Sequence, residues 1–144
     1  MDKFSRYFMD VAIRTAELSY ARRLQVGIIA VRDRRIIACG YNGTPEGEDN
    51  NCEDEVYSDG VLTLVTKLSV NHAEVNMINF VKKFSITLAG TDIYITHSPC
   101  ICCAEALVQQ GIIKVTYLID YRCNLGVEYL RKENIEVIPY AQRT

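Results

Sequence analysis

The sequence predicts a single α/β domain in which helices lie on both faces of a sheet. The chain has 144 residues, 49% of them apolar, and runs of strand-forming residues alternate with helical patterns. A chain of this length forms one domain with a sizeable core. Strands that alternate with helices are typical of a sheet covered by helices. We therefore expect one domain over residues 1–144, with the order α-β-β-α-β-α-β-α-β.

The first half of the chain contains a predicted helix, a hairpin and a long loop. The helix has apolar positions at helical spacing, namely Phe4, Phe8, Val11, Ala12 and Thr15. Asp2 precedes them as a cap. Runs rich in β-branched residues at Val26–Val31 and Ile36–Gly40 flank the charged turn Arg32–Arg35 and indicate a hairpin. Gly, Pro, Asn and acidic residues then favour a loop over Asn42–Asp59.

Helices and strands alternate in the second half. Val61–Val70 fits either a strand or a short helix, and the sequence leaves both open. A helix is predicted to begin at Ala73. The remaining predicted elements are strands at Ile93–Thr96, Val115–Ile119 and Glu136–Ile138, and helices at Ile101–Gln110 and Val127–Lys132.

Charge and hydropathy argue against several classes of protein. Sixteen Lys and Arg against eighteen Asp and Glu give a net charge of −2, whereas proteins that bind polymeric nucleic acid carry a basic excess. The apolar runs are far shorter than the roughly 20 residues that span a bilayer. The first residues lack a signal-peptide pattern. We expect a cytoplasmic protein, in the host cytoplasm if it is viral, with its six cysteines as thiols.

Reactive side chains concentrate in Asn71–Glu74 and Ser98–Cys103, two segments at which helices are predicted to begin. Cys100 and Cys103 are three residues apart, so their sulfurs lie on one face of a helix and can bind one ion. The helix N-terminus favours their thiolate forms. His72 supplies a nitrogen. Three protein ligands leave one position of a tetrahedral zinc ion open, which predicts a catalytic zinc site.

Glu74 follows His72 by two residues, close enough to reach water on that ion but poorly placed to ligate it. Zinc lowers the pKa of bound water to about 7, and Glu74 is the predicted proton-transfer group. The pattern H-x-E followed by P-C-x-x-C is a signature of zinc-dependent nucleobase deaminases. A structural zinc site or a redox cysteine pair leaves Glu74 without a role.

The other candidate metal ligands receive different interpretations. Cys102 could pair with Cys100, but spacing of two turns the sulfurs apart, so Cys103 is preferred. His97 is interpreted as a surface or loop histidine. Cys39 is interpreted as a small core residue of the second strand, and Cys123 as a thiol of a loop or helix start.

Over nearly its whole length, the chain resembles the deoxycytidylate (dCMP) deaminases of the zinc-dependent cytidine/deoxycytidylate deaminase family. Beyond the two motifs, the resemblance rests on Gln25–Gly27, Gly40–Pro45, Asp49–Glu53 and Asn76. It implies a three-layer α/β/α fold with a mixed five-stranded sheet. It also implies zinc-dependent hydrolysis of dCMP to dUMP and ammonia, which supplies dUMP for thymidylate synthesis. A homohexamer activated by dCTP and inhibited by dTTP is further implied.

The resemblance also assigns roles to residues of the substrate site. Asn42 matches the asparagine that binds the sugar hydroxyl near the 3′ position, and Ala73 and Ser98 match groups that contact the base. Tyr121 matches an aromatic residue near the pyrimidine, although a packing tyrosine is an equal alternative. Backbone N–H groups of residues 40–47, with Arg122 or Lys83, are candidates for the phosphate.

A regulatory triphosphate site is implied at Gln25, Tyr41 and Gly43, where the acidic loop could hold Mg²⁺. Some phage relatives bind a second, structural zinc. Here Tyr20 occupies one matching position and Cys52 has no histidine partner except His97, so one zinc per chain is expected. The loop before residue 71 is also shorter than in those relatives.

Alternative functions remain at this point. The acidic balance and the segment 40–45 argue against a tRNA adenosine deaminase. Cytosine or guanine deaminases and a bifunctional dCMP/dCTP deaminase stay open, because the motif does not encode the number of phosphates. Glu74 argues against a zinc-stabilised binding module without turnover, because a structural site gains nothing from an unligated carboxylate beside its metal.

Overall fold

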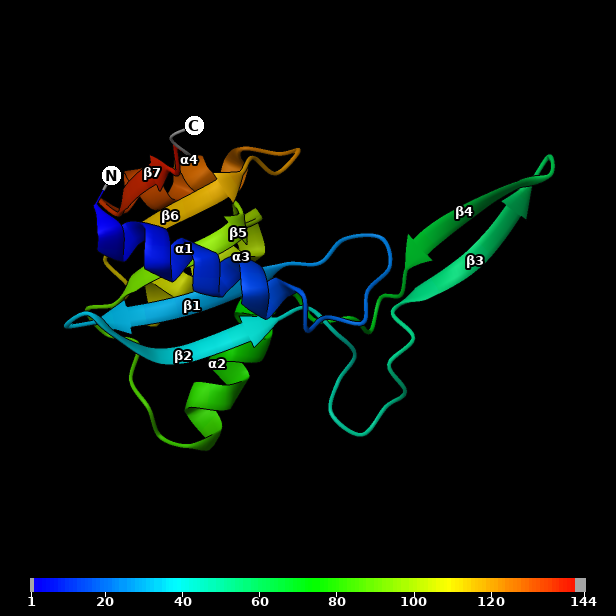
Figure 1. The fold of residues 1–144 in the computed structure, drawn as a ribbon. Coiled ribbons are helices and arrows are strands. Elements are labelled where there is room, and N and C mark those ends of the chain that lie inside the picture. The colour runs from blue at the N-terminus through cyan, green and yellow to red at the C-terminus, as the bar shows by residue number, and fades with distance from the viewer. Residues whose placement is uncertain (1, 142–144) are drawn as a thin grey trace.

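The computed structural model describes residues 2–141, which form a five-stranded sheet, four helices and a separate two-stranded hairpin (Figure 1). The helices are α1 (Lys3–Ala16), α2 (Ala73–Lys83), α3 (Ile101–Gln109) and α4 (Leu125–Lys132). The strands of the large sheet are β1 (Gly27–Arg32), β2 (Arg35–Tyr41), β5 (Asp92–His97), β6 (Lys114–Ile119) and β7 (Glu136–Pro139). The hairpin consists of β3 (Glu53–Ser58) and β4 (Val61–Thr66).

The large sheet has the strand order β2-β1-β5-β6-β7 and is mixed. β1 runs antiparallel to both β2 and β5, whereas β5, β6 and β7 are parallel to one another. Helices α3 and α4 make the crossovers between the parallel strands. This arrangement confirms the predicted mixed five-stranded sheet.

Helices cover both faces of the sheet, as predicted. Side chains alternate between the faces along β1. Ile28 and Ala30 pack into the larger core with residues of α2, α3 and α4, whereas Ile29 and Val31 pack against α1. The cap predicted for α1 is present, since the Asp2 carboxylate accepts a hydrogen bond from the backbone N–H of Ser5 at 2.8 Å. No described helix has the length and apolarity that a membrane crossing requires.

The hairpin corrects the prediction of a loop over Asn42–Asp59. Its first strand begins at Glu53 within that range, and Val61–Thr66 is a strand, which decides the ambiguous segment. The turn is Asp59-Gly60, and both residues have positive φ angles, 51° and 77°. Asp-Gly is a favoured two-residue hairpin turn, so the signal was present in the sequence. The prediction missed the hairpin because its first strand is rich in acidic residues. A strand that does not pack on the core needs no regular alternation of apolar residues.

The hairpin projects away from the body of the protein (Figure 1). Several of its large apolar side chains are exposed, namely Val56, Tyr57, Val61, Leu62 and Val65. A two-stranded hairpin is at best marginally stable alone in water. Its exposed apolar side chains are therefore available for contact with another subunit.

Cys39 corrects a second prediction, because it is exposed rather than part of the core. It lies on the edge strand β2 between Ala38 and Gly40, which are both buried. Residues adjacent in a strand point to opposite faces. The buried neighbours face α2, so Cys39 faces the other side of the strand. Cys123 lies in the loop before α4, where it was predicted.

Candidate active site

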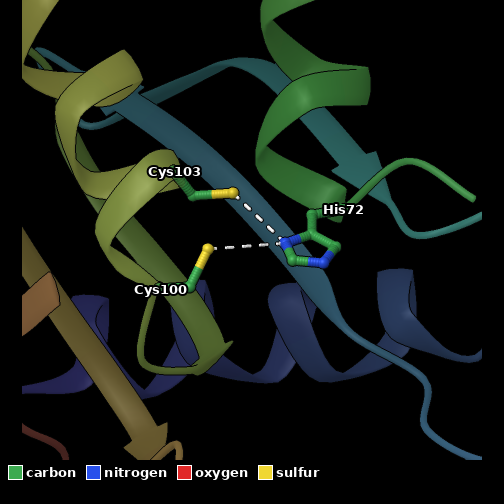
Figure 2. A group of neighbouring side chains, drawn as sticks. All are labelled: His72, Cys100 and Cys103. Carbon is green, nitrogen blue, oxygen red and sulfur yellow. Dashed lines mark hydrogen bonds between the residues drawn. The ribbon is translucent and has the colours of Figure 1, made fainter. Parts of the chain in front are cut away.

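The two reactive segments meet at the starts of α2 and α3. His72 is the residue before the first turn of α2, and Cys100 has the same place in α3. Neither side chain caps its own helix, so both are free for other contacts. Nδ1 of His72 lies 3.3 Å from Sγ of Cys103 and 3.6 Å from Sγ of Cys100. Figure 2 shows the two sulfurs and the ring nitrogen directed toward one another.

Two glycines allow these helix starts to approach their neighbours. A Cβ on Gly40 of β2 would meet the carbonyl oxygen of Ala73 in the first turn of α2. A Cβ on Gly126 of α4 would meet the carbonyl oxygen of Pro99, just before α3. Both contacts are backbone to backbone, so a side chain could be accommodated only by displacing a helix start. The glycines therefore position the segments that carry the histidine and the cysteines.

The three side chains fit a zinc ion. Their ligand atoms lie within 4.8 Å of one another. Zinc bonds of about 2.3 Å to sulfur and 2.0–2.1 Å to nitrogen place tetrahedral ligand atoms roughly 3.6 Å apart. The distances of 3.3 and 3.6 Å between nitrogen and sulfur agree with that spacing. One nitrogen and two sulfurs are donors that zinc prefers, and a fourth position stays available for a water or a substrate.

The remaining candidate ligands lie apart from this group. Cys102 is exposed and does not join it in the described part of the chain. His97 ends β5, and its Nδ1 lies 3.0 Å from the hydroxyl of Thr96. His97 is half-buried rather than a surface residue, and burial lowers the pKa of its imidazole. Cys52 is buried near the base of the hairpin.

A cavity of about 490 Å³ opens beside the group. Its lining includes His72 and Cys100 together with Glu74. The four residues predicted to contact substrate also line it, namely Asn42, Ala73, Ser98 and Tyr121. Chain segments that are distant in sequence therefore converge on one cavity that can hold a small ligand.

Glu74 lies in the first turn of α2 and is only 4% exposed. Burial raises the pKa of its carboxyl group. Burial, and then the neighbouring charge of Glu74, raise the pKa of the Cys103 thiol. A cation bound among these groups favours their charged forms, since a coordinating thiol is deprotonated. These side chains therefore suit a metal ion, and their charged forms would be unfavourable in this buried place without one.

Asn42 is held by the chain segment before β1. Its Oδ1 accepts a hydrogen bond from the N–H of Val26 at 2.9 Å, and its Nδ2 donates to the carbonyl of Leu24 at 2.8 Å. An amide nitrogen carries two hydrogens, so one donor remains. Asn42 can therefore offer a donor to a ligand from a fixed position.

Ser98 connects the ends of two parallel strands. Its hydroxyl accepts a hydrogen bond from the N–H of Tyr121 at 2.7 Å, and its N–H donates to the carbonyl of Ile119 at 3.0 Å. These bonds fix the loop after β6 against the end of β5. Tyr121 thereby lies in the cavity wall, and the Ser98 hydroxyl keeps its own hydrogen for another acceptor.

The structure also places charged residues in the cavity lining that the sequence did not indicate. Arg23 and Glu53 line the cavity together with Arg122, whereas Lys83 does not. Lys83 lies in the last turn of α2 with its Nζ 3.9 Å from a carboxylate oxygen of Glu46. Lys83 is therefore not placed to bind a ligand in this cavity. No motif marks Arg23, and Glu53 belongs to the segment Asp49–Glu53 that carries the resemblance but received no role of its own there.

The three residues implied in a regulatory site do not line this cavity in the described chain. Gln25 donates from Nε2 to the carbonyl of Ser19 at 2.8 Å. The carbonyl of Tyr41 accepts a hydrogen bond from Nδ2 of Asn76 at 2.8 Å. Gly43 exchanges two backbone hydrogen bonds with residue 71. Their role in regulation stays a prediction.

The fold and the site define a zinc-dependent deaminase class, and comparison with known proteins identifies the family. The cytidine and deoxycytidylate deaminase zinc-binding region matches residues 2–119. The chain belongs to the cytidine and deoxycytidylate deaminase family, and zinc is its metal. The resemblance inferred from the motifs is thus confirmed.

Three similar proteins illustrate this membership. ComE operon protein 2 of Bacillus subtilis is 40% identical over 120 residues, which cover 83% of this chain and 61% of that protein. The deoxycytidylate deaminase of Mycobacterium phage D29 is 30% identical over 125 residues, which cover 79% of this chain and 93% of that protein. The crystal structure of dCMP deaminase from cyanophage S-TIM5, in complex with dCMP and dUMP, has a TM-score of 0.86 at 33% identity, covering 97% of this chain and 99% of that one.

Proposed function

We propose that this protein hydrolyses dCMP to dUMP and ammonia. The observation that carries the proposal is the convergence of His72, Cys100 and Cys103 beside a buried carboxylate in one cavity. The similarity to the cyanophage enzyme, whose structure contains dCMP and dUMP, supports the substrate. The similarity spans nearly the whole length of both chains, so it includes the cavity walls as well as the motifs.

His72, Cys100 and Cys103 would hold the zinc ion. When bound, zinc lowers the pKa of a coordinated water toward 7. Glu74 acts on the pyrimidine: it takes the proton from the water that attacks C4 and delivers it to N3. The same carboxyl group then takes the second proton from the new C4 hydroxyl and passes it to the amine, so that the C4–N bond breaks, C4 becomes a carbonyl, and water and dCMP yield dUMP and ammonia. Its position supports this role, because the buried carboxyl group lines the same cavity as His72 and Cys100 and can exchange protons with a substrate bound there.

The cavity walls bind the rest of the substrate. The backbone of Ala73 and the hydroxyl of Ser98 contact the base, and Tyr121 lies beside it. The free amide hydrogen of Asn42 donates to the sugar. Arg23 and Arg122 provide guanidinium groups for the phosphate, which binds such planar donors well.

Ammonia release from a panel of cytosine, deoxycytidine, dCMP and dCTP tests this function. We expect dCMP to have the highest kcat/KM. Equal turnover of free deoxycytidine would contradict the nucleotide assignment, and a preference for dCTP would indicate a triphosphate-accepting deaminase.

We further propose a homo-oligomeric assembly in the cytoplasm, with the hexamer implied by the resemblance as the expected form. The projecting hairpin β3–β4 supports it, because its exposed apolar side chains would be covered by another subunit. We propose regulation by dCTP and dTTP, bound with Mg²⁺ near Gln25, Tyr41 and Gly43. Tyr41 is partly exposed and Gly43 adjoins open space, which supports access to this region.

A further inference from the structure

Glu53 is a buried carboxylate with one oxygen in use and one free. The residue is only 1% exposed at the start of β3. Its Oε2 accepts hydrogen bonds from the backbone N–H groups of Arg22 at 2.9 Å and Arg23 at 3.0 Å. Its Oε1 is buried and has no hydrogen-bond partner among the described residues. The closest cation, Nε of Arg22, is 3.6 Å away, beyond hydrogen-bond distance.

An unpaired buried acceptor is costly. Burying a polar group without a hydrogen bond destabilises a protein, and the cost is larger when the group is charged. Unsatisfied buried groups are rare in native proteins, and each is explained by strain, by a catalytic role, or by a bound water, ion or ligand. Glu53 lines the cavity beside the metal ligands, so a bound ligand can supply the missing donor.

Glu53 and Asn42 hold the same short strap, residues 22–26, from different ends. Glu53 binds the N–H groups of Arg22 and Arg23, and Asn42 binds the carbonyl of Leu24 and the N–H of Val26. Both side chains also line the cavity. A ligand that contacts Asn42 therefore lies next to the strap that Glu53 also binds.

We propose that Oε1 of Glu53 accepts a hydrogen bond from the 3′-hydroxyl of the substrate's deoxyribose. This inference rests on the proposed function, and it names a specificity residue for that reaction. At neutral pH, dCMP has two strong donors outside its largely deprotonated phosphate, the 4-amino group and the 3′-hydroxyl. The amino group must lie at the reacting centre with His72 and Cys100. The 3′-hydroxyl is the donor left for a carboxylate near Arg23.

The charges of the strap are consistent with this assignment. A carboxylate would repel the phosphate if the two faced each other directly. The Glu53 charge is instead accompanied by Arg22, with Nε 3.6 Å from Oε1, while Arg23 lines the cavity and is available for the phosphate. A hydroxyl between sugar and carboxylate is a neutral donor and meets no such repulsion.

The test compares dCMP with 2′,3′-dideoxycytidine 5′-monophosphate, which lacks only the 3′-hydroxyl. A hydrogen bond to a charged group is worth about 1.5–3 kcal/mol, so we expect wild type to prefer dCMP by roughly 10–100-fold in kcat/KM. In Glu53→Gln this preference should fall about tenfold, because kcat/KM for dCMP falls while kcat/KM for the dideoxy nucleotide does not. Asp54→Asn is the matched control, because Asp54 is the next residue of β3, is exposed and lies outside the cavity lining.

A merely structural role for Glu53 would lower activity on both substrates by the same factor, which would overturn the inference. The dissociation constants of dUMP and 2′,3′-dideoxyuridine 5′-monophosphate provide a readout without turnover. If Glu53→Gln unfolds, Glu53→Asp takes its place in the same comparison, and equal affinity of the wild type for the two ligands overturns the inference. A wild type that releases no ammonia from dCMP overturns the proposed function itself, together with the inference that rests on it.

Discussion

Nδ1 of His72 lies 3.3 Å from Sγ of Cys103, a residue 31 positions further along the chain. The contact exists because α2 and α3 begin at the same edge of the sheet, where the cavity opens. The two motifs are therefore parts of one site, and the distances suit a metal that both segments ligate.

We expect one zinc ion per chain. Cys103→Ala should lose the metal, because the two remaining ligands bind zinc too weakly to retain it. The free energy of unfolding should fall as well, because metal binding stabilises the fold. Cys102→Ala is the matched control and should keep its zinc, because Cys102 is exposed and outside the ligand group. Metal analysis of the purified variants measures this. Close to two equivalents in wild type, with the second removed by Cys52→Ala, would contradict it.

Glu74→Gln should retain zinc and substrate binding but lose most turnover. General acid–base catalysis contributes typically 10²–10⁴-fold, so kcat should fall within that range, whereas the dissociation constant of dUMP should change little. Steady-state kinetics and product titration measure the two quantities. A kcat within about tenfold of wild type would show that another group moves the proton.

Arg23→Gln should reduce kcat/KM for dCMP about 10–100-fold, with little effect on deoxycytidine, because a charged hydrogen bond to the phosphate is lost. Lys83→Gln is the control, since Lys83 does not line the cavity. Kinetics on both substrates separate the phosphate contact from a general loss of structure. An equal reduction for nucleotide and nucleoside would show that Arg23 does not bind the phosphate.

Gly126→Ala should lower the free energy of unfolding by about 1–3 kcal/mol, the usual cost of overpacking. The added Cβ would meet the carbonyl of Pro99 and displace the start of α3, so zinc affinity should fall too. Gly43→Ala is the stability control, because a Cβ there meets nothing within 4 Å. Denaturant unfolding and a zinc competition assay measure both effects. Unchanged stability and zinc affinity would mean that the segment before α3 adapts freely.

Regulation should appear as a sigmoidal dependence of rate on dCMP concentration. We expect dCTP to make the curve hyperbolic and dTTP to lower the rate. Couplings of about 1–3 kcal/mol change affinity 5–150-fold and require distinct conformational states. Rate curves with each triphosphate, together with the mass in solution, measure this. A monomer with hyperbolic kinetics that ignores both nucleotides would contradict both regulation and oligomeric assembly.

Local patterns in the sequence were sufficient for the helices, the central strands and the metal motif. The positions of His72 and Glu74, and the three-residue spacing of Cys100 and Cys103, are properties of adjacent residues. A helix start converts such spacing directly into geometry, so the cluster could be anticipated before its segments were known to meet. The hairpin turn at Asp59-Gly60 was also predictable from the sequence, but the acidic residues before it favoured a loop.

Only the tertiary structure decided the rest. Cys39 is exposed because β2 is an edge strand of the sheet, and no local sequence pattern predicts the position of a strand within a sheet. Arg23 and Glu53 lie 30 residues apart and resemble any charged surface residues, yet the strap and the hairpin base bring them into one cavity wall. Burial and an unpaired oxygen distinguish Glu53 from its acidic neighbours. Both are properties of what surrounds a side chain in space, and they therefore arise only when distant segments pack together.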